Sequence, residues 1–172
     1  MFKTANSMCI IDWKNQILSD LQNDDEIVEA LNLHDDEDSE NLVWNRLFPH
    51  YYIPDTQEVV KTYILVEIDI QSSRNRYEPT RYDLYAYPTI TFYVLSHQKD
   101  MQMKMTGISA TRTDYISMLL DKRYNGKNGF GLGRLQLTSN IAGNLNDTFR
   151  FRQLVFQAVD FNNELCGGDF SA

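Results

Sequence analysis

The chain has 172 residues, a formal net charge of −8, and hydrophobic and charged fractions of 42% and 23%, as in an ordinary globular protein. This length accommodates one compact domain with a substantial core and is short for two. The N-terminus lacks the basic segment and apolar run of a signal peptide, and no stretch approaches the roughly 18 apolar residues of a spanning helix. We therefore expect neither export by a signal peptide nor insertion into a membrane.

The charge is distributed unevenly along the chain. Residues 1–60 carry 3 basic and 13 acidic side chains, a net charge of −10, whereas the remainder is net +2. This argues against residues 1–60 as a DNA-binding surface, because acidic side chains repel phosphates. It leaves open a head-to-tail association of oppositely charged faces in an oligomer.

The predicted elements begin with two helices after a leader, residues 1–9. Apolar side chains recur from residue 10 to residue 21 at the spacing of an amphipathic helix. They are Ile10, Trp13, Ile17, Leu18 and Leu21. Asn23 followed by Glu26 is a capping-box pattern, which predicts that a second short helix begins at Asn23. We expect both helices to present one apolar face to a sheet.

An acidic run, residues 34–41 (HDDEDSEN), follows the helices. Its like charges disfavour a compact helix, which indicates an exposed loop. A calcium loop is the alternative, but the central glycine that such a loop requires is missing, so we predict no metal site. Residues 42–53 predict a short strand that leads into an extended segment, because Pro49 and Pro54 punctuate the run.

Two long strands are predicted by alternating hydrophobicity, at residues 61–70 and 85–97. Their predicted core-facing side chains are Ile64, Val66, Ile68 and Ile70 in the first strand and Ile90, Phe92 and Val94 in the second. The polar loop 71–79 joins them into a wide hairpin with a basic tip. Further along, the period-two repeat of Met101, Met103 and Met105 predicts a short extended edge.

Residues 111–137 predict a capped helix, a glycine-rich turn and the start of a strand. Thr111 caps the helix together with Asp114, and Gly126 ends it. The predicted packing face consists of Tyr115, Met118, Leu119 and Lys122. Gly129, Gly131 and Gly133 then precede a strand that opens at Leu135, and a last strand covers residues 149–161 after a turn at 143–147.

These elements predict an α+β fold in a single domain. We expect a mostly antiparallel or mixed sheet of about four to five strands, flanked by an N-terminal helical pair and one central helix. Residues 10–162 form this domain, and residues 163–172 form a C-terminal tail.

The sequence contains no recognisable catalytic, cofactor-binding or metal-binding set, and we predict that the protein is not an enzyme. The glycines of residues 129–133 follow a helix and precede a strand, the wrong order for a phosphate-binding loop. Ser96 and His97 are adjacent on a strand and therefore point to opposite faces, which makes them a poor nucleophile and base. Cys9 and Cys166 lack CxxC spacing, so two reduced thiols are the default expectation and a disulfide is the alternative.

One basic stretch is interleaved with aromatic side chains. Its candidate interface residues are Arg74, Arg76, Tyr77 and Arg81. Three interpretations stay open: a subunit or partner interface, since Tyr and Arg are common interface anchors; a solvated hairpin tip; and a nucleic-acid contact through phosphates and base stacking.

The order helix, strand, strand-loop-strand hairpin, helix, glycine turn, strand and strand resembles that of the tail-terminator and neck (head-to-tail joining) proteins of tailed bacteriophages. The residues that carry the resemblance are IDWKNQILSDL, the helix DYISMLLDKRYNGK followed by GFGLGRLQL, and the closing strand FRFRQLVFQAVDFN, within residues 10–162. These are patterns of a fold more than signatures of a chemistry.

The resemblance implies a structural virion protein without cofactors, a subunit of a ring, commonly a hexamer, that caps the tail tube and joins it to the head connector. Its partners would be its own copies, the tail tube protein and the head-connector or neck proteins, and DNA would pass through without specific binding. It would assemble in the host cytoplasm and reside in the tail or neck of the virion.

In such a ring we expect subunit contacts through sheet edges and the 71–81 loop. The acidic side chains Asp35, Asp36, Glu37 and Asp38 would line or flank the channel, or form a surface cluster. The alternative function is a sheet-based nucleic-acid-binding module that uses the same basic loop.

Overall fold

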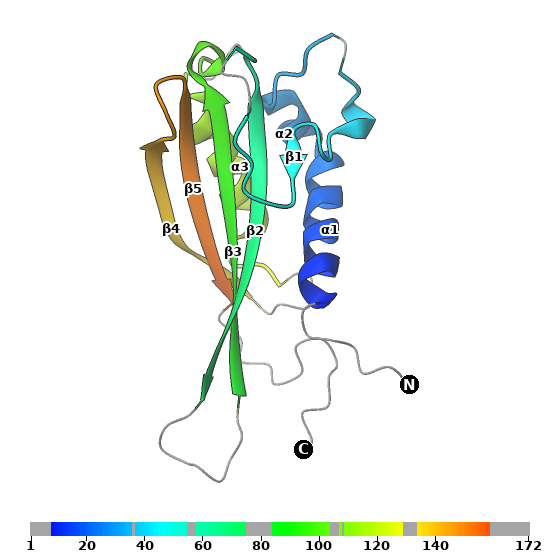
Figure 1. Cartoon of the computed structure of the whole chain (residues 1–172), viewed down its shortest axis with the longest axis vertical. Helices are drawn as coiled ribbons and strands as arrows, with labels where there is room; N and C mark the ends of the chain where they lie inside the picture. Colours follow the sequence, from blue (N-terminus) through cyan, green and yellow to red (C-terminus); the bar gives the residue numbers. More distant parts are fainter. Residues whose placement is uncertain are drawn as a thin grey trace.

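The computed structural model describes residues 8–35, 37–54, 58–74, 84–103, 107, 109–128 and 134–158, with the backbone alone at 71–74 and 84–87. Within them, three α-helices cover one face of a five-stranded mixed sheet (Figure 1). The elements are α1 (Met8–Gln22), α2 (Asp25–Ala30), η1 (Ser39–Asn41), β1 (Leu47–Phe48), β2 (Thr62–Arg74), β3 (Leu84–His97), η2 (Gln98–Asp100), α3 (Arg112–Tyr124), β4 (Leu135–Asn144) and β5 (Phe149–Ala158). The predicted α+β fold is confirmed.

The sheet has the strand order β1-β2-β3-β5-β4. β2 and β3 form the predicted hairpin, antiparallel from Thr62 opposite Ser96 to Arg74 opposite Leu84. β1 pairs with β2 in parallel, and β5 lies antiparallel between β3 and β4. The sheet is therefore mixed, with β4 at one edge and the two-residue β1 at the other.

The main core lies between the helices and the even-numbered side chains of the central strands. As predicted from alternation, the side chains of Ile64, Val66, Ile68, Ile90, Phe92 and Val94 are buried there. The apolar side of α1 packs on them, with Ile17 and Leu21 fully buried. The alternation of apolar and polar residues predicted which side chains face the core, because successive side chains of a strand point to opposite sides of the sheet.

The predicted packing face of α3 is partly wrong. Leu119 is buried, but Met118 is 47% exposed and the Lys122 side chain is 69% exposed. The buried side of the helix runs instead through Ile116, Leu120 and Tyr124. Apolar side chains three and four residues apart occur on more than one stripe of this helix, so spacing alone did not select the buried one.

The helix ends follow local capping chemistry. Thr111 is the N-cap of α3, and its side chain accepts a hydrogen bond from the amide of Asp114, as predicted. Gly126, at φ +73°, takes the left-handed conformation just after α3, which glycine adopts without strain. The second helix is capped by Asp24, which accepts from the amide of Ile27, rather than by Asn23. Aspartate and asparagine are equivalent cap residues, so neighbouring candidates were not distinguishable.

The described part of α1 begins at Met8, within the predicted leader of residues 1–9. Gln102 makes a bridge with Thr111, and residues 104–106 of the predicted extended edge lie outside the described residues. One further expectation needs correction. Cys9 is disulfide-bonded, so the default of two reduced thiols is wrong; Cys166, the other cysteine of the sequence, lies outside the described residues. The glycine turn at 129–133 and the tail beyond Ala158 also lie outside them.

The opposite face of the sheet, called here the outer face, carries a smaller cluster of aromatic and aliphatic side chains. Its buried members are Phe48, Tyr63, Leu65, Leu95 and Phe149. At its margin the ring of Phe151 lies across Gly143 on the neighbouring strand, where a β-carbon would collide with the ring. Among the described residues, no helix has the length and apolarity needed to cross a membrane.

Candidate functional site

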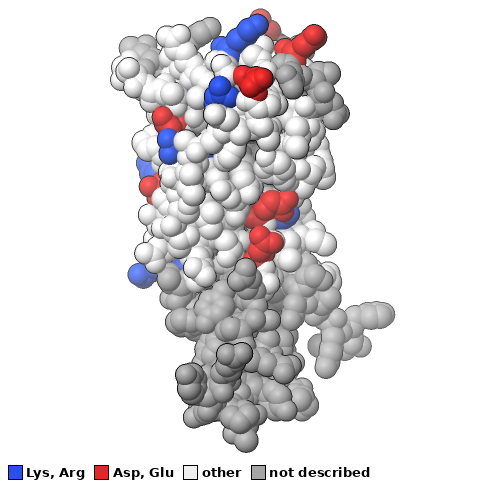
Figure 2. Space-filling model, turned by 60° about the vertical axis from the view of Figure 1, so that its left-hand side comes forward, with Lys and Arg blue, Asp and Glu red and all other residues white. Residues whose placement is uncertain are grey.

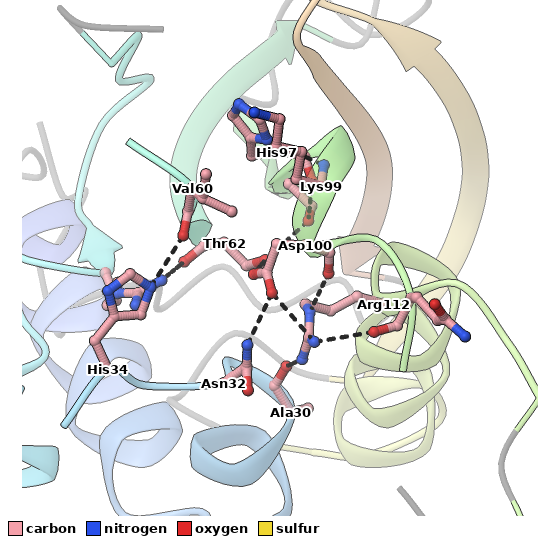
Figure 3. A network of polar contacts seen from close by, with 12 residues as sticks. Ala30, Asn32, His34, Val60, Thr62, His97, Lys99, Asp100 and Arg112 are labelled. Carbon is pink, nitrogen blue, oxygen red and sulfur yellow. Dashed lines mark hydrogen bonds and ion pairs between the residues drawn. The ribbon is translucent and has the colours of Figure 1, made fainter. Parts of the chain in front are cut away.

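A buried polar network joins the start of β2, the end of β3 and the start of α3 (Figure 3). The carboxylate of Asp100 accepts hydrogen bonds from Asn32 Nδ2 at 2.8 Å and from Thr62 Oγ1 at 2.7 Å. Arg112 Nη2 lies 3.3 Å from Asp100 Oδ1, and the guanidinium also donates to the carbonyl of Ala30 at 2.5 Å. Burial lowers the pKa of Arg112, while the charge of Asp100 opposes that shift. The network fastens α2 and α3 to the central strands.

The network contains hydroxyl groups, but their placement does not suit catalysis. Ser96 Oγ lies 2.9 Å from Thr62 Oγ1, and both side chains are fully buried. His97 points to the outer face, as predicted, with its ring 5.3 Å from that of Phe149 and its Nδ1 accepting from the amide of Lys99. Ser96 and His97 therefore do not face each other, and the hydroxyls hold the fold together.

A second polar cluster surrounds Glu37. The carboxylate accepts hydrogen bonds from Arg46 Nε at 2.8 Å, from Lys61 Nζ at 2.6 Å and from the amide of His34 at 2.9 Å. Burial raises the pKa of Glu37, but the hydrogen bonds from Arg46, the His34 amide and Lys61 outweigh burial and hold that pKa far below its ordinary value. Arg46 is itself fully buried and also donates to the carbonyl of Thr62.

The acidic cluster predicted at residues 35–38 is therefore not a uniform exposed surface. Glu37 turns inward, with its side chain 4% exposed, which corrects the expectation of a solvated charge there. Asp38 caps η1 by accepting from the amide of Glu40. Asp35 is exposed, and Asp36 lies outside the described residues. A role for Asp35 and Asp38 beside a channel stays a prediction.

On the outer face of the sheet, the strands β3, β5 and β4 form an uncharged area, whereas β2 adds the charged side chains of Glu67 and Asp69. The outward side chains described on β3, β5 and β4 are Thr89, Thr91, Tyr93, Leu95, His97, Phe149, Phe151, Gln153, Val155, Gln157, Gln136, Ser139 and Ile141. None of these is Asp, Glu, Lys or Arg. Figure 2 shows a broad uncharged area, with the charged side chains gathered around its margins.

β4 forms an open edge of the sheet in the described part of the chain. It is ten residues long, contains neither a charged residue nor a proline, and pairs on one side with β5. Natural proteins usually protect an edge strand by charge, proline, a β-bulge, shortness or a covering element, because unpaired backbone groups recruit another strand. β4 has a bulge between Leu137 and Ser139, but its sequence supplies neither charge nor proline.

Large apolar side chains are exposed at both lateral sides of the molecule. On the α1 and β1 side they are Met8, Ile11, Trp44, Tyr51 and Ile53, and on the β4 side the exposed side chain is Ile141; Met118 lies on α3, which packs over the inner face of the sheet. Trp44 is 65% exposed and Ile141 is 56% exposed. Neither exposure is evident from the sequence, because an aromatic or aliphatic residue in a short strand or at a sheet edge is ordinarily assigned to the core.

The predicted interface in the basic loop cannot be placed. The backbone of Arg74 ends β2, and Arg76, Tyr77 and Arg81 lie outside the described residues. In the described part of the chain, no group of three His, Cys, Asp or Glu residues could hold a metal ion. The features brought together on the surface are thus the outer face, the β4 edge and the exposed apolar side chains.

Comparison with known proteins gives one family. The YomW family matches residues 17–158, which comprise most of the chain and all five strands. The family name, YomW, is that of a phage-type protein, which indicates a phage-related family. A comparison with curated proteins finds no match.

Proposed function

Because this chain belongs to the YomW family, which is phage-related, we propose that it is a structural virion protein of a tailed phage. More specifically, we propose a tail-terminator or neck subunit that forms a ring, caps the tail tube and joins it to the head connector. The fold agrees with the α+β domain that this resemblance implies.

The observation that carries the proposal is the β4 edge, which in the described part of the chain has no covering element, charge or proline, beside the uncharged area of the outer face on β3, β5 and β4. An edge of this kind on a soluble monomer is a site of uncontrolled association, whereas in a closed ring a neighbouring subunit covers it. Exposed Trp44 supports the same conclusion, because Trp is one of the residue types most common among the residues that dominate binding at protein interfaces. Ile141 adds an exposed apolar side chain on the edge strand itself.

Negative-stain microscopy of the purified chain tests this function. We expect ring-shaped particles with a central hole, and sedimentation velocity should give a single species larger than the monomer. A chain that remains monomeric at all protein concentrations, with no rings in the images, would overturn the proposal.

A DNA-binding titration at several salt concentrations tests the nucleic-acid alternative. Binding to phosphates weakens steeply as salt rises, because counterions are released on binding. The ring subunit should bind duplex DNA weakly or not at all, whereas strong, steeply salt-dependent binding would favour the nucleic-acid-binding module.

A further inference from the structure

We propose that neighbouring copies pack side by side in parallel orientation, with the β4 side of one copy against the α1 and β1 side of the next. The occupant of the β4 edge is thus a second copy of this chain. This inference rests on the proposed ring and names the surfaces that would close it. Two pairs of exposed side chains support this arrangement. The two members of each pair lie on opposite sides of the molecule at a similar position along the strand direction.

The first pair is apolar. Strand register runs in one continuous row from Ile141 on β4 through β5, β3 and β2 to Phe48 on β1. The ring of Trp44 lies 6.3 Å from that of Phe48, so Trp44 stands beside the same row at the opposite side of the sheet. Ile141 and Trp44 are therefore exposed at the same height on opposite sides of one molecule.

The second pair is charged. Another row runs from Gln136 on β4 across β5 and β3 to Asp69 on β2. The carbonyl of Lys127 accepts a hydrogen bond from the amide of Leu135, which places Lys127 beside the start of β4, next to this row. Lys127 and Asp69 are both exposed. A cation on one side thus matches an anion at a similar height on the other.

The heights determine the relative orientation of the copies. The height of a residue is its position along the strand direction. Rotation of one copy about an axis parallel to the strands leaves this position unchanged. It therefore brings Ile141 of one copy toward Trp44 of the next, and Lys127 of one copy toward Asp69 of the next. A two-fold axis perpendicular to the strands would invert the heights and mismatch the two pairs. Contacts between copies related by the rotation parallel to the strands join two different surfaces, and they generate a ring when the rotation closes. The absence of charge along β4 lets two chains of net charge −8 approach there.

Site-specific photo-cross-linking tests the contact in the full chain. Trp44 is replaced by p-benzoylphenylalanine, and the irradiated assembly is digested with trypsin. The expected product joins position 44 to the peptide 135–150, which contains Ile141. The two positions are separated by four strand spacings within one chain, roughly 19 Å, so a direct cross-link between them comes from two copies. Mixing isotopically labelled and unlabelled chains verifies this origin.

A pair of matched variants provides a second readout. Ile141→Arg places a charge in the proposed contact and should weaken self-association at least tenfold in sedimentation velocity. Met118→Arg makes the same change on a side chain of similar exposure on α3, and it should leave self-association unchanged. Circular dichroism on both variants verifies the fold.

The outcomes separate this inference from the proposed function. Rings that cross-link to peptide 135–150 and dissociate with Ile141→Arg support both. Rings that cross-link elsewhere, or that tolerate Ile141→Arg, overturn the contact and leave the ring function standing. A wild-type chain that forms no assembly overturns the ring and the contact together.

Discussion

Replacing Arg46 by Met should destabilise the protein strongly, because it leaves Glu37 in the interior without its main partner. Arg46 is fully buried, donates to Glu37 from both Nε and Nη2, and donates to the carbonyl of Thr62 at 3.0 Å. In the variant the carboxylate, 4% exposed, retains Lys61 and the His34 amide. Removing one partner of a buried ion pair costs about 3–5 kcal/mol. That is a large share of a typical stability of about 5–15 kcal/mol.

Urea unfolding at neutral pH measures this loss as a lower midpoint with an unchanged slope. The matched control is Lys122→Met, which removes a 3.3 Å pair with Glu26 whose side chains are 69% and 59% exposed. The control should change stability by less than about 1 kcal/mol, because exposed pairs contribute little. Adding Glu37→Gln to Arg46→Met should recover part of the loss, since the unpaired charge is removed. An Arg46→Met variant within about 1 kcal/mol of wild type would refute the buried pair.

Three further predictions concern pH, packing and assembly. The pKa of Glu37 is lowered below its ordinary 4.5, so the native state binds fewer protons than the unfolded chain, and its contribution to stability is present above that pH and is lost as the pH falls. Urea midpoints measured from pH 6 to pH 3 should fall less steeply in Glu37→Gln than in wild type. Gly143→Ala should cost about 1–3 kcal/mol in urea unfolding, because the new methyl group meets the Phe151 ring, and Phe151→Leu in the same chain should reduce that cost. Neutralising the three arginines of the 71–81 loop with Gln should weaken ring assembly, and normal rings and tail lengths in that variant would exclude the loop from the interface.

The strands were predictable because their signal is local and has one solution. Alternating side chains at residues 61–70 fit a half-buried strand, and a shift by one residue would have turned Ile64 and Val66 toward solvent. The helix α3 was predictable in extent but not in orientation. Its rotation is determined by long-range partners: Tyr124 stacks on Phe92 and donates to Asp20, more than 100 residues away in sequence. No local pattern encodes such partners.

The candidate site was less predictable than the fold, for a related reason. The acidic run at 34–41 was interpreted from its own composition as solvated. Its inward member, Glu37, is paired with cations 9 and 24 residues further along the chain. Likewise, the exposure of Trp44 and Ile141 depends on the absence of a covering element in the described fold, which sequence spacing does not reveal.

The internal ion pairs also change what the uneven charge means for assembly. Of the 13 acidic residues in the first 60, Asp20 and Asp24 pair with Arg123, Glu26 pairs with Lys122, and Glu37 pairs with Arg46 and Lys61. Four of these 13 negative charges are therefore paired within the molecule, three of them with cations of α3 and one, Glu37, in the interior. A surface attraction between copies has fewer acidic partners than the sequence suggests, and exposed charge pairs contribute little individually. The association of copies should then depend chiefly on the apolar contact between Trp44 and the uncharged β4 edge, with charge pairs such as Lys127 and Asp69 selecting the orientation.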